Sequence, residues 1–155
     1  TDYWVYGDVA PSGKGSRVLI SSVKVAGPKP TWDTKLSLSR TGIDGNLKGL
    51  LSTLEPIEIG RKATIQVKLF DAKTGQPAGD TVNWLGAAGH MMIFHQDGMT
   101  VVHSHPAEDE ENAALVKQGI VRFTGRFPKV GTYKVYAQFD WQGAIRTLPF
   151  AVEVK

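Results

Sequence analysis

The sequence predicts an all-β fold: an immunoglobulin-like antiparallel β-sandwich that carries an N-terminal β extension. Val, Ile, Thr and aromatic residues recur in short runs, and several runs alternate with polar residues at the period of a half-buried strand. The 17 glycines and 8 prolines are spread along the chain and supply turns between these runs. Short strands with turn signals at this spacing are typical of β-sandwiches.

The chain of 155 residues is long enough to bury a hydrophobic core within one domain. Its hydrophobic pattern becomes denser from Leu47 onward. We therefore expect an extension of strands and loops at residues 1–46 and the sandwich at residues 47–155. Within the extension, an alternating run at residues 17–25 predicts a strand, and residues 35–39 are a second short candidate.

Four alternating runs predict strands of the sandwich, at residues 63–70, 120–124, 132–141 and 144–154. A turn is expected at residues 71–77, and Gln142-Gly143 predicts a hairpin between the last two strands. No segment has a convincing helical period, although residues 110–118 could form one or two helical turns.

Composition narrows the function. The chain has no cysteine, which excludes disulfides and thiolate metal sites. The net charge is +3, but the 18 Lys and Arg residues are scattered singly rather than interleaved with aromatics, so we expect a solvated surface and no nucleic-acid partner. No apolar run approaches the ~18 residues of a membrane span, and no charged-then-apolar leader is present. Because the sequence opens at Thr1 rather than Met, a processed or trimmed N-terminus is expected.

One stretch, residues 89–106, holds all four histidines and all three methionines of the chain. Asp97-Gly98 lies near its middle, flanked on both sides by apolar alternation, and is the strongest short hairpin signal in the sequence. A two-residue turn there pairs Met92 with His103 and His90 with His105.

Directly opposed residues share a face of a hairpin. The predicted register therefore brings four side chains together on one face: His90, Met92, His103 and His105. His95 falls on the other face, beside the turn. A loop longer by one residue would separate His90 from the others, whereas His103 and His105 share a face in every register.

Such a cluster predicts a metal site. Neutral imidazole binds copper, zinc, nickel and iron, while a thioether favours Cu(I), so a mixed His and Met set favours copper, as Cu(I) or Cu(II). Three imidazoles alone also describe a zinc site with an open fourth position, and zinc is the alternative. Met92 is either a direct ligand or a packing residue beside the site.

The chain from residue 54 to residue 154 is similar to the YtkA/FixH-like group of secreted or periplasmic immunoglobulin-like domains associated with heavy-metal and copper handling. The resembling segments are Gly60 with residues 70–77, residues 85–90, residues 103–106, residues 127–135, Gln138-Phe139 and residues 147–150. The Gly-His pair followed by His-x-His-Pro is the most specific part. The resemblance implies a β-sandwich, a periplasmic or extracellular location, a non-catalytic role and metal binding at His90, His103 and His105.

Two other functions stay open. In a cupin-like enzyme, iron or manganese would be held by His103, His105 and Glu110, although the later histidine of a cupin is missing. In a zinc-hydroxide hydrolase, the three histidines would bind zinc, and the acidic run at residues 108–111 would have to supply a general base. That run is otherwise expected to be solvated surface. In a metal-free interaction module the histidines are incidental, and the tryptophans are candidate interface anchors: Trp4, Trp32, Trp84 and Trp141.

The function that we expect first is a copper carrier, buffer or delivery domain that uses a histidine cluster on a β-hairpin. Its partners would be the metal ion and a periplasmic or membrane copper-handling protein.

Overall fold

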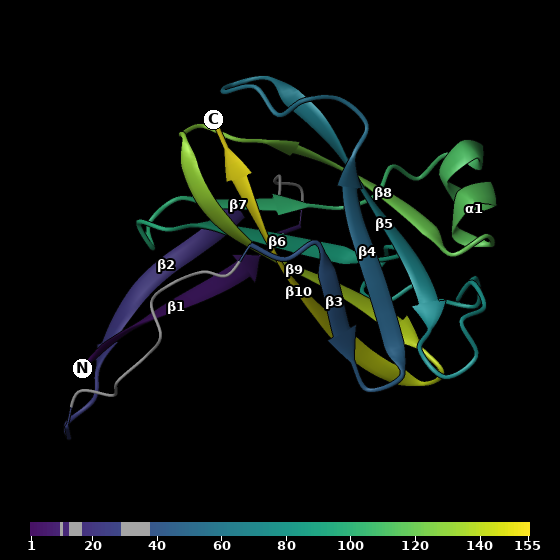
Figure 1. Ribbon diagram of the computed structural model, residues 1–155. Coiled ribbons are helices and arrows are strands. Elements are labelled where there is room, and N and C mark those ends of the chain that lie inside the picture. Colours follow the sequence, from purple (N-terminus) through teal and green to yellow (C-terminus); the bar gives the residue numbers. More distant parts are fainter. Residues whose placement is uncertain (10, 13–16, 29–37) are drawn as a thin grey trace. The chain divides into compact units, whose positions relative to one another are not determined.

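The computed structural model describes residues 1–9, 11–12, 17–28 and 38–155 (Figure 1). The chain divides into two compact units, Thr1–Lys35 and Leu36–Lys155. Part of the strand expected at residues 35–39, and Trp32, lie outside the described residues; Leu38 and Ser39 are not in a strand.

The N-terminal unit contains an antiparallel pair, β1 (Asp2–Val9) and β2 (Arg17–Lys24). β2 confirms the strand expected at residues 17–25. Cross-strand pairs such as Tyr3 with Val23 place apolar side chains on the ribbon, and Trp4 is 47% exposed. A two-stranded ribbon has no second layer of its own in which to bury such side chains.

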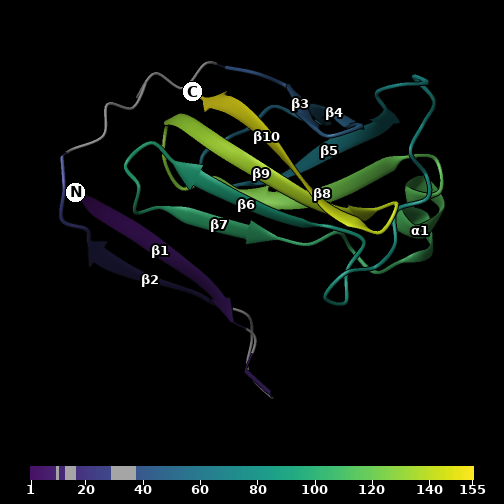
Figure 2. The same cartoon turned by 90° about the horizontal axis from the view of Figure 1, so that it is seen from below.

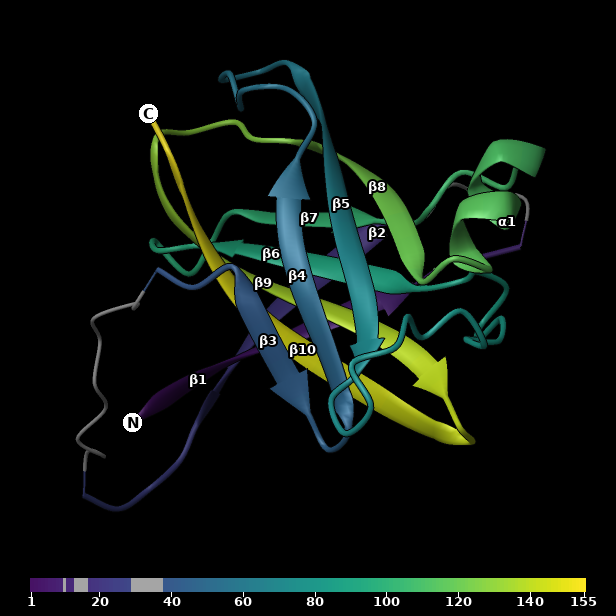
Figure 3. The same cartoon turned by 45° about the vertical axis from the view of Figure 1, so that its right-hand side comes forward.

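The second unit is an immunoglobulin-like β-sandwich, as the sequence predicts. One sheet has the order β3-β4-β5-β8 and the other the order β10-β9-β6-β7, and all pairs are antiparallel. Figures 2 and 3 show the two sheets packed face to face. The first sheet comprises β3 (Thr41–Asp44), β4 (Leu47–Thr53), β5 (Lys62–Asp71) and β8 (Ile120–Arg126). The second comprises β6 (His90–His95), β7 (Val101–Ser104), β9 (Gly131–Trp141) and β10 (Ala144–Val154).

Alternation along the strands builds the core between the sheets. In β9 every second residue from Tyr133 to Trp141 is buried, and the intervening residues are half-buried. Gly49 in β4 allows close approach of the opposite sheet, because a Cβ there would lie 2.6 Å from Leu148 Cδ1. Gln142 and Gly143 both have positive φ in the turn between β9 and β10, which confirms the predicted hairpin.

The sheet begins earlier in the chain than the expected division at residues 46 and 47. β3 lies within the predicted extension, yet it pairs with β4 from Thr41 opposite Leu50 to Asp44 opposite Leu47. Only four residues, Thr41–Asp44, precede the turn at Gly45-Asn46. This run is too short to be recognised as a strand from the sequence. The compact unit accordingly starts at Leu36.

The described tryptophans lie in different environments. Trp4 is exposed, and Trp84 is half-buried. Trp141 is 2% exposed, and its Nε1 donates to Asp80 Oδ1 at 2.6 Å, so it anchors the segment that follows β5. Burial removes Trp141 from the candidate interface anchors.

A tyrosine corner fixes the connection between β8 and β9. Tyr133 is fully buried, its hydroxyl donates to the Lys129 carbonyl at 2.9 Å, and the Lys129 amide donates back to it at 3.2 Å. Burial raises the pKa of the Tyr133 hydroxyl. This arrangement is a hallmark of immunoglobulin-like folds, and it gives Tyr133 a structural role.

We predict that Tyr133→Phe lowers the free energy of unfolding by about 0.5–1.5 kcal/mol, because both backbone groups of Lys129 lose their partly buried hydroxyl partner. Chemical denaturation monitored by tryptophan fluorescence measures this. Tyr136→Phe, on the half-buried outer face of the same strand, is the matched control. Equal stabilities for the two variants would contradict a structural role of the corner hydroxyl.

Candidate metal centre

The hairpin of β6 and β7 has the register that the sequence predicts. Met92 lies opposite His103, and the ladder runs from Met91 opposite Ser104 to Phe94 opposite Val101. The loop is wider than the predicted two residues, since the last ladder bond joins the His95 amide to the Thr100 carbonyl at 2.9 Å. Widening a loop by two residues, one on each side, leaves the pairing of every other residue unchanged. Each residue of the hairpin therefore lies on the face of the sheet that the sequence predicts.

Asp97 organises this loop. Its Oδ1 accepts from the amides of Met99 and Thr100, both at 2.9 Å, and its Oδ2 accepts from Lys129 Nζ at 2.7 Å. Lys129 and the loop amides hold the pKa of the Asp97 carboxyl well below its usual range. Gly98 has φ 68°, which suits glycine at this position.

His95 lies apart from the other histidines, as expected from its position on the opposite face. It is 8% exposed, and its ring centroid lies 4.8 Å from that of Tyr133. Its Nε2 lies 3.0 Å from the Val130 carbonyl and must carry the proton, because a carbonyl only accepts. Its Nδ1 lies 3.2 Å from the Asp97 amide nitrogen and 3.0 Å from Asp97 Oδ2. His95 is thus a structural residue of the turn.

The other three histidines converge on the outer face of the sheet. One ring nitrogen from each of His90, His103 and His105 lies within 4.8 Å of the other two. The ring centroids of His103 and His105 are 4.4 Å apart, those of His90 and His105 are 4.6 Å apart, and those of His90 and His103 are 6.1 Å apart. We call these three residues the histidine cluster.

A backbone carbonyl sets the tautomer of His90. Its Nε2 lies 2.8 Å from the Trp84 carbonyl and therefore donates to it, which leaves Nδ1 with a lone pair. His105 Nε2 lies 2.9 Å from that Nδ1, so in the metal-free protein it donates to it. The lone pair of His90 thus points into the cluster, and the Trp84 carbonyl is placed as an outer-shell partner of the kind that orients metal-binding histidines.

The separations are close to those of a ligand set. Two nitrogens bound to one zinc at about 2.05 Å with a tetrahedral angle lie about 3.3 Å apart. The His90 and His105 nitrogens, at 2.9 Å, are slightly closer than this, and the widest separation in the cluster is at most 4.8 Å, about 1.5 Å more than in such a tetrahedral site. The ring of His105 is exposed, so it is the member of the cluster that is free to adjust its distance to an ion.

Two local features bring His90 to this place. Residues Trp84 to Ala87 form a tight turn in which each end bonds the other, with the Trp84 amide to the Ala87 carbonyl at 2.9 Å, and Leu85 and Gly86 both have positive φ. Gly89 then lets the chain pass Phe139, whose ring carbon would lie 2.8 Å from a Cβ at that position. The Trp84 ring also packs edge-on against His90, with centroids 5.0 Å apart.

The cluster opens to solvent on one side. His90 is 8% exposed, His103 is half-buried, and His105 is exposed. Met92 is half-buried and lies on the same face, directly opposite His103. Pro106 is buried and bridges to Phe123 in β8, so the chain leaves the hairpin directly after His105. An ion could enter at His105.

The carboxylate required by the cupin-like alternative does not join the cluster. Among the described residues the group that could hold an ion consists of three histidines, and Glu110 is not a member. Glu110 instead begins the helix α1 (Glu110–Val116), for which Asp109 is the N-cap and accepts from the Asn112 amide at 2.8 Å. The expected helical turns are confirmed, and the acidic run supplies their first turn.

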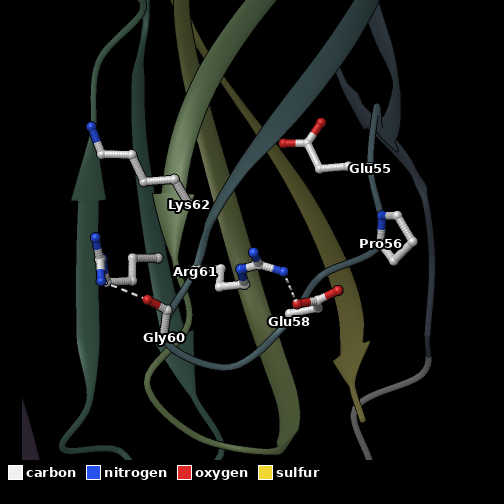
Figure 4. Close-up of a pocket in the computed structure, with 7 residues that line it drawn as sticks. Glu55, Pro56, Glu58, Gly60, Arg61 and Lys62 are labelled. Atoms are coloured by element: carbon white, nitrogen blue, oxygen red, sulfur yellow. Dashed lines mark hydrogen bonds and ion pairs between the residues drawn. The ribbon is translucent and has the colours of Figure 1, made fainter.

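Apart from the histidine cluster, a hollow of about 500 Å³ lies at the start of β5 (Figure 4). Most of its charged side chains already have partners. Arg61 pairs with Glu58 at 2.6 Å, Arg126 donates to the Gly60 carbonyl at 2.5 Å, and Glu55 accepts from the Thr64 amide. This hollow offers no group of histidines or carboxylates for a metal.

Sequence reasoning found all three members of the cluster but not the Trp84 carbonyl. A backbone acceptor has no residue-type signal, and Leu85 gives no hint of positive φ. Gly86 was the one local sign of a turn.

The fold and the site define an immunoglobulin-like β-sandwich with a histidine cluster on its outer face. The profile of one protein family, described as "Domain of unknown function (DUF8832)", matches residues 42–155, and the chain belongs to this family. None of the curated proteins compared matches the chain. Among solved structures, the Lin-41 filamin domain is similar with 17% identity and a TM-score of 0.44, over 74% of this chain and 97% of that one. No helix in the described part of the chain is long and apolar enough to cross a membrane.

We predict that Asp97→Asn destabilises the protein at neutral pH and that its deficit relative to the natural chain shrinks on acidification. A carboxyl with a lowered folded-state pKa stabilises the fold above the unfolded-state pKa of about 4 and loses that effect as the pH falls below it. Urea denaturation between pH 7 and pH 3 measures the difference. Lys129→Met is the matched control and should show the same trend; a deficit independent of pH would contradict the assignment.

Proposed function

We propose that the histidine cluster binds one transition-metal ion, with copper as the first candidate and zinc as the alternative. The observation that carries the proposal is the convergence of three imidazole nitrogens within 4.8 Å at the end of a rigidly paired hairpin. Each ring offers a neutral nitrogen donor, the class of ligand that suits copper and zinc. The lone pair of His90 is already directed at the cluster by the Trp84 carbonyl.

Met92 gives the preference for copper. Its place opposite His103 makes a thioether available on the same face of the sheet. Thioethers favour Cu(I) and contribute little to zinc sites. The donor set His90, His103, His105 and Met92 would then serve Cu(I), and the three histidines alone would serve Cu(II) or zinc with an open position.

We infer a role in carrying, buffering or delivering the ion. A carrier must release its ion as well as bind it, and the exposed ring of His105 gives a route for exchange with a partner's ligands. The resemblance to YtkA/FixH-like domains supports a periplasmic or extracellular setting and a copper-handling partner. The rival functions are a metalloenzyme on the same histidines and a metal-free interaction module.

The test is titration of Cu(II) and of Zn(II) into the metal-free chain, followed by isothermal calorimetry. We expect one ion per chain. His105→Ala should weaken binding by at least about 100-fold, because loss of an outer-shell partner alone typically costs 10–100-fold and this change removes a ligand. His105 is exposed, so the fold should survive the substitution.

Controls separate the cluster from other donors. His95→Gln changes the one histidine outside the cluster and should leave the affinity unchanged. For Cu(I), Met92→Leu should weaken binding and Met99→Leu, a 51% exposed residue of the turn, should not. Binding that is absent, or that persists in His105→Ala and His103→Ala, would overturn the proposal. Absence of binding with every ion would favour the interaction module, and turnover of a substrate by the loaded protein would favour the enzyme.

A further inference from the structure

A cavity of about 550 Å³ lies between the segment that joins β5 to β6 and the segment that contains α1. Both segments lie at the same end of the sandwich (Figures 1 and 3). The histidine cluster does not line this cavity, although Ala88 and Pro106 on its walls are close in sequence to His90 and His105. The volume is within the range of binding sites for small ligands and short peptide segments.

One face of α1 is turned to this cavity. Lining residues recur at helical spacing at Asp109, Ala113, Val116 and Lys117. No residue of the helix is fully buried: Leu115 and Val116 are half-buried, Val116 packs against the core, and Ala113 is exposed. The facing wall is also formed by small residues, Ala87 among them. Hydrocarbon of the exposed Ala113 and of the half-buried Val116 therefore lines the cavity.

The helix is nonetheless held in place at its C-terminal end. Gly79 passes so close to the Lys117 carbonyl that a Cβ would lie 2.0 Å from the oxygen. At the other end Arg122 of β8 pairs with Glu111 at 2.8 Å. The cavity is consequently a fixed space between two anchored segments.

The mouth of the cavity carries negative charge. Glu108 and Glu110 line it, and neither carboxylate makes a hydrogen bond or ion pair among the described residues, whereas Asp109 caps the helix. Lys117 is the lone cationic residue in the described lining. Thr81 on the opposite wall has a buried hydroxyl with no hydrogen-bond partner in the described part of the chain. The charge at the mouth is therefore negative although the net charge of the chain is +3.

We propose that this cavity docks a basic peptide segment of a partner protein, a lysine flanked by apolar residues. The four-carbon stem of lysine would lie along Ala113 and Val116 while its ammonium group reaches Glu108 and Glu110. The flanking apolar side chains would cover the remaining hydrocarbon. The interaction is weak and sensitive to salt, because the carboxylates are exposed. It goes beyond the metal proposal and does not depend on it.

The test is an NMR titration of the full chain with acetyl-Leu-Lys-Leu-amide, followed at the backbone amides of Gly86, Ala87 and Ala113. We expect saturable shifts at these amides. The double variant E108Q/E110Q should bind about fivefold more weakly, as two exposed ion pairs are lost. The matched peptide acetyl-Leu-Glu-Leu-amide should not saturate. His105→Ala should bind the lysine peptide as the natural chain does, which separates this site from the metal site.

Four results would overturn the docking proposal. They are the absence of saturable shifts at millimolar peptide, equal binding of the glutamate peptide, equal binding by E108Q/E110Q, and equally tight binding of n-butylamine, which would indicate a site for free amines. Ala113→Leu provides a second variant: the residue is exposed, so the helix tolerates the change, but the added side chain should fill the cavity and abolish the shifts. Metal titration of the same sample reports separately on the histidine cluster.

Discussion

The pairing of β6 with two neighbouring strands at once determines which side chains of the hairpin lie on the outer face of the sheet. β6 is bonded to β7 on one edge and to β9 on the other, with His90 opposite Gln138 and Met92 opposite both His103 and Tyr136. A slip of one residue would have to break both ladders and would bring His90 into the core and Met91 out of it. Met91 is fully buried, so hydrophobic burial opposes that slip. The geometry of the histidines is thus maintained by the packing of the sandwich.

Within the histidine cluster, the three rings differ in how firmly they are held and how far they are exposed. The inner member, His90, is held by a ring contact with Trp84 and by its carbonyl, whereas the outer member, His105, lies in solvent. In the metal-free protein a hydrogen bond joins the two rings, and an ion would take the place of its proton. For an ion bound there, the preformed inner ring would favour affinity because less side-chain freedom is lost on binding, and the exposed outer ring would favour exchange. Both properties are needed in a carrier.

Much of this could be predicted from the sequence, because alternation and turn chemistry are local signals. Residues 63–70 and 132–141 alternate cleanly and form β5 and β9, and Asp97-Gly98 correctly indicated the register of the hairpin. The loop itself is wider than expected, since Asp97 binds the amides of Met99 and Thr100 in place of a tight turn, yet the symmetric change preserved the faces. β3 and the Trp84 carbonyl were not predictable, because one is a short strand fixed by its neighbour and the other is a backbone group. The cavity beside α1 likewise depends on two segments distant in sequence.

The most direct measurement of the central claim is a crystal structure of the copper- or zinc-loaded chain with anomalous scattering recorded at both metal edges. We predict one anomalous peak about 2.0–2.1 Å from His90 Nδ1, His105 Nε2 and one ring nitrogen of His103. A peak located elsewhere, or a His90 ring that turns its Nδ1 away from the other two histidines in the loaded protein, would contradict it.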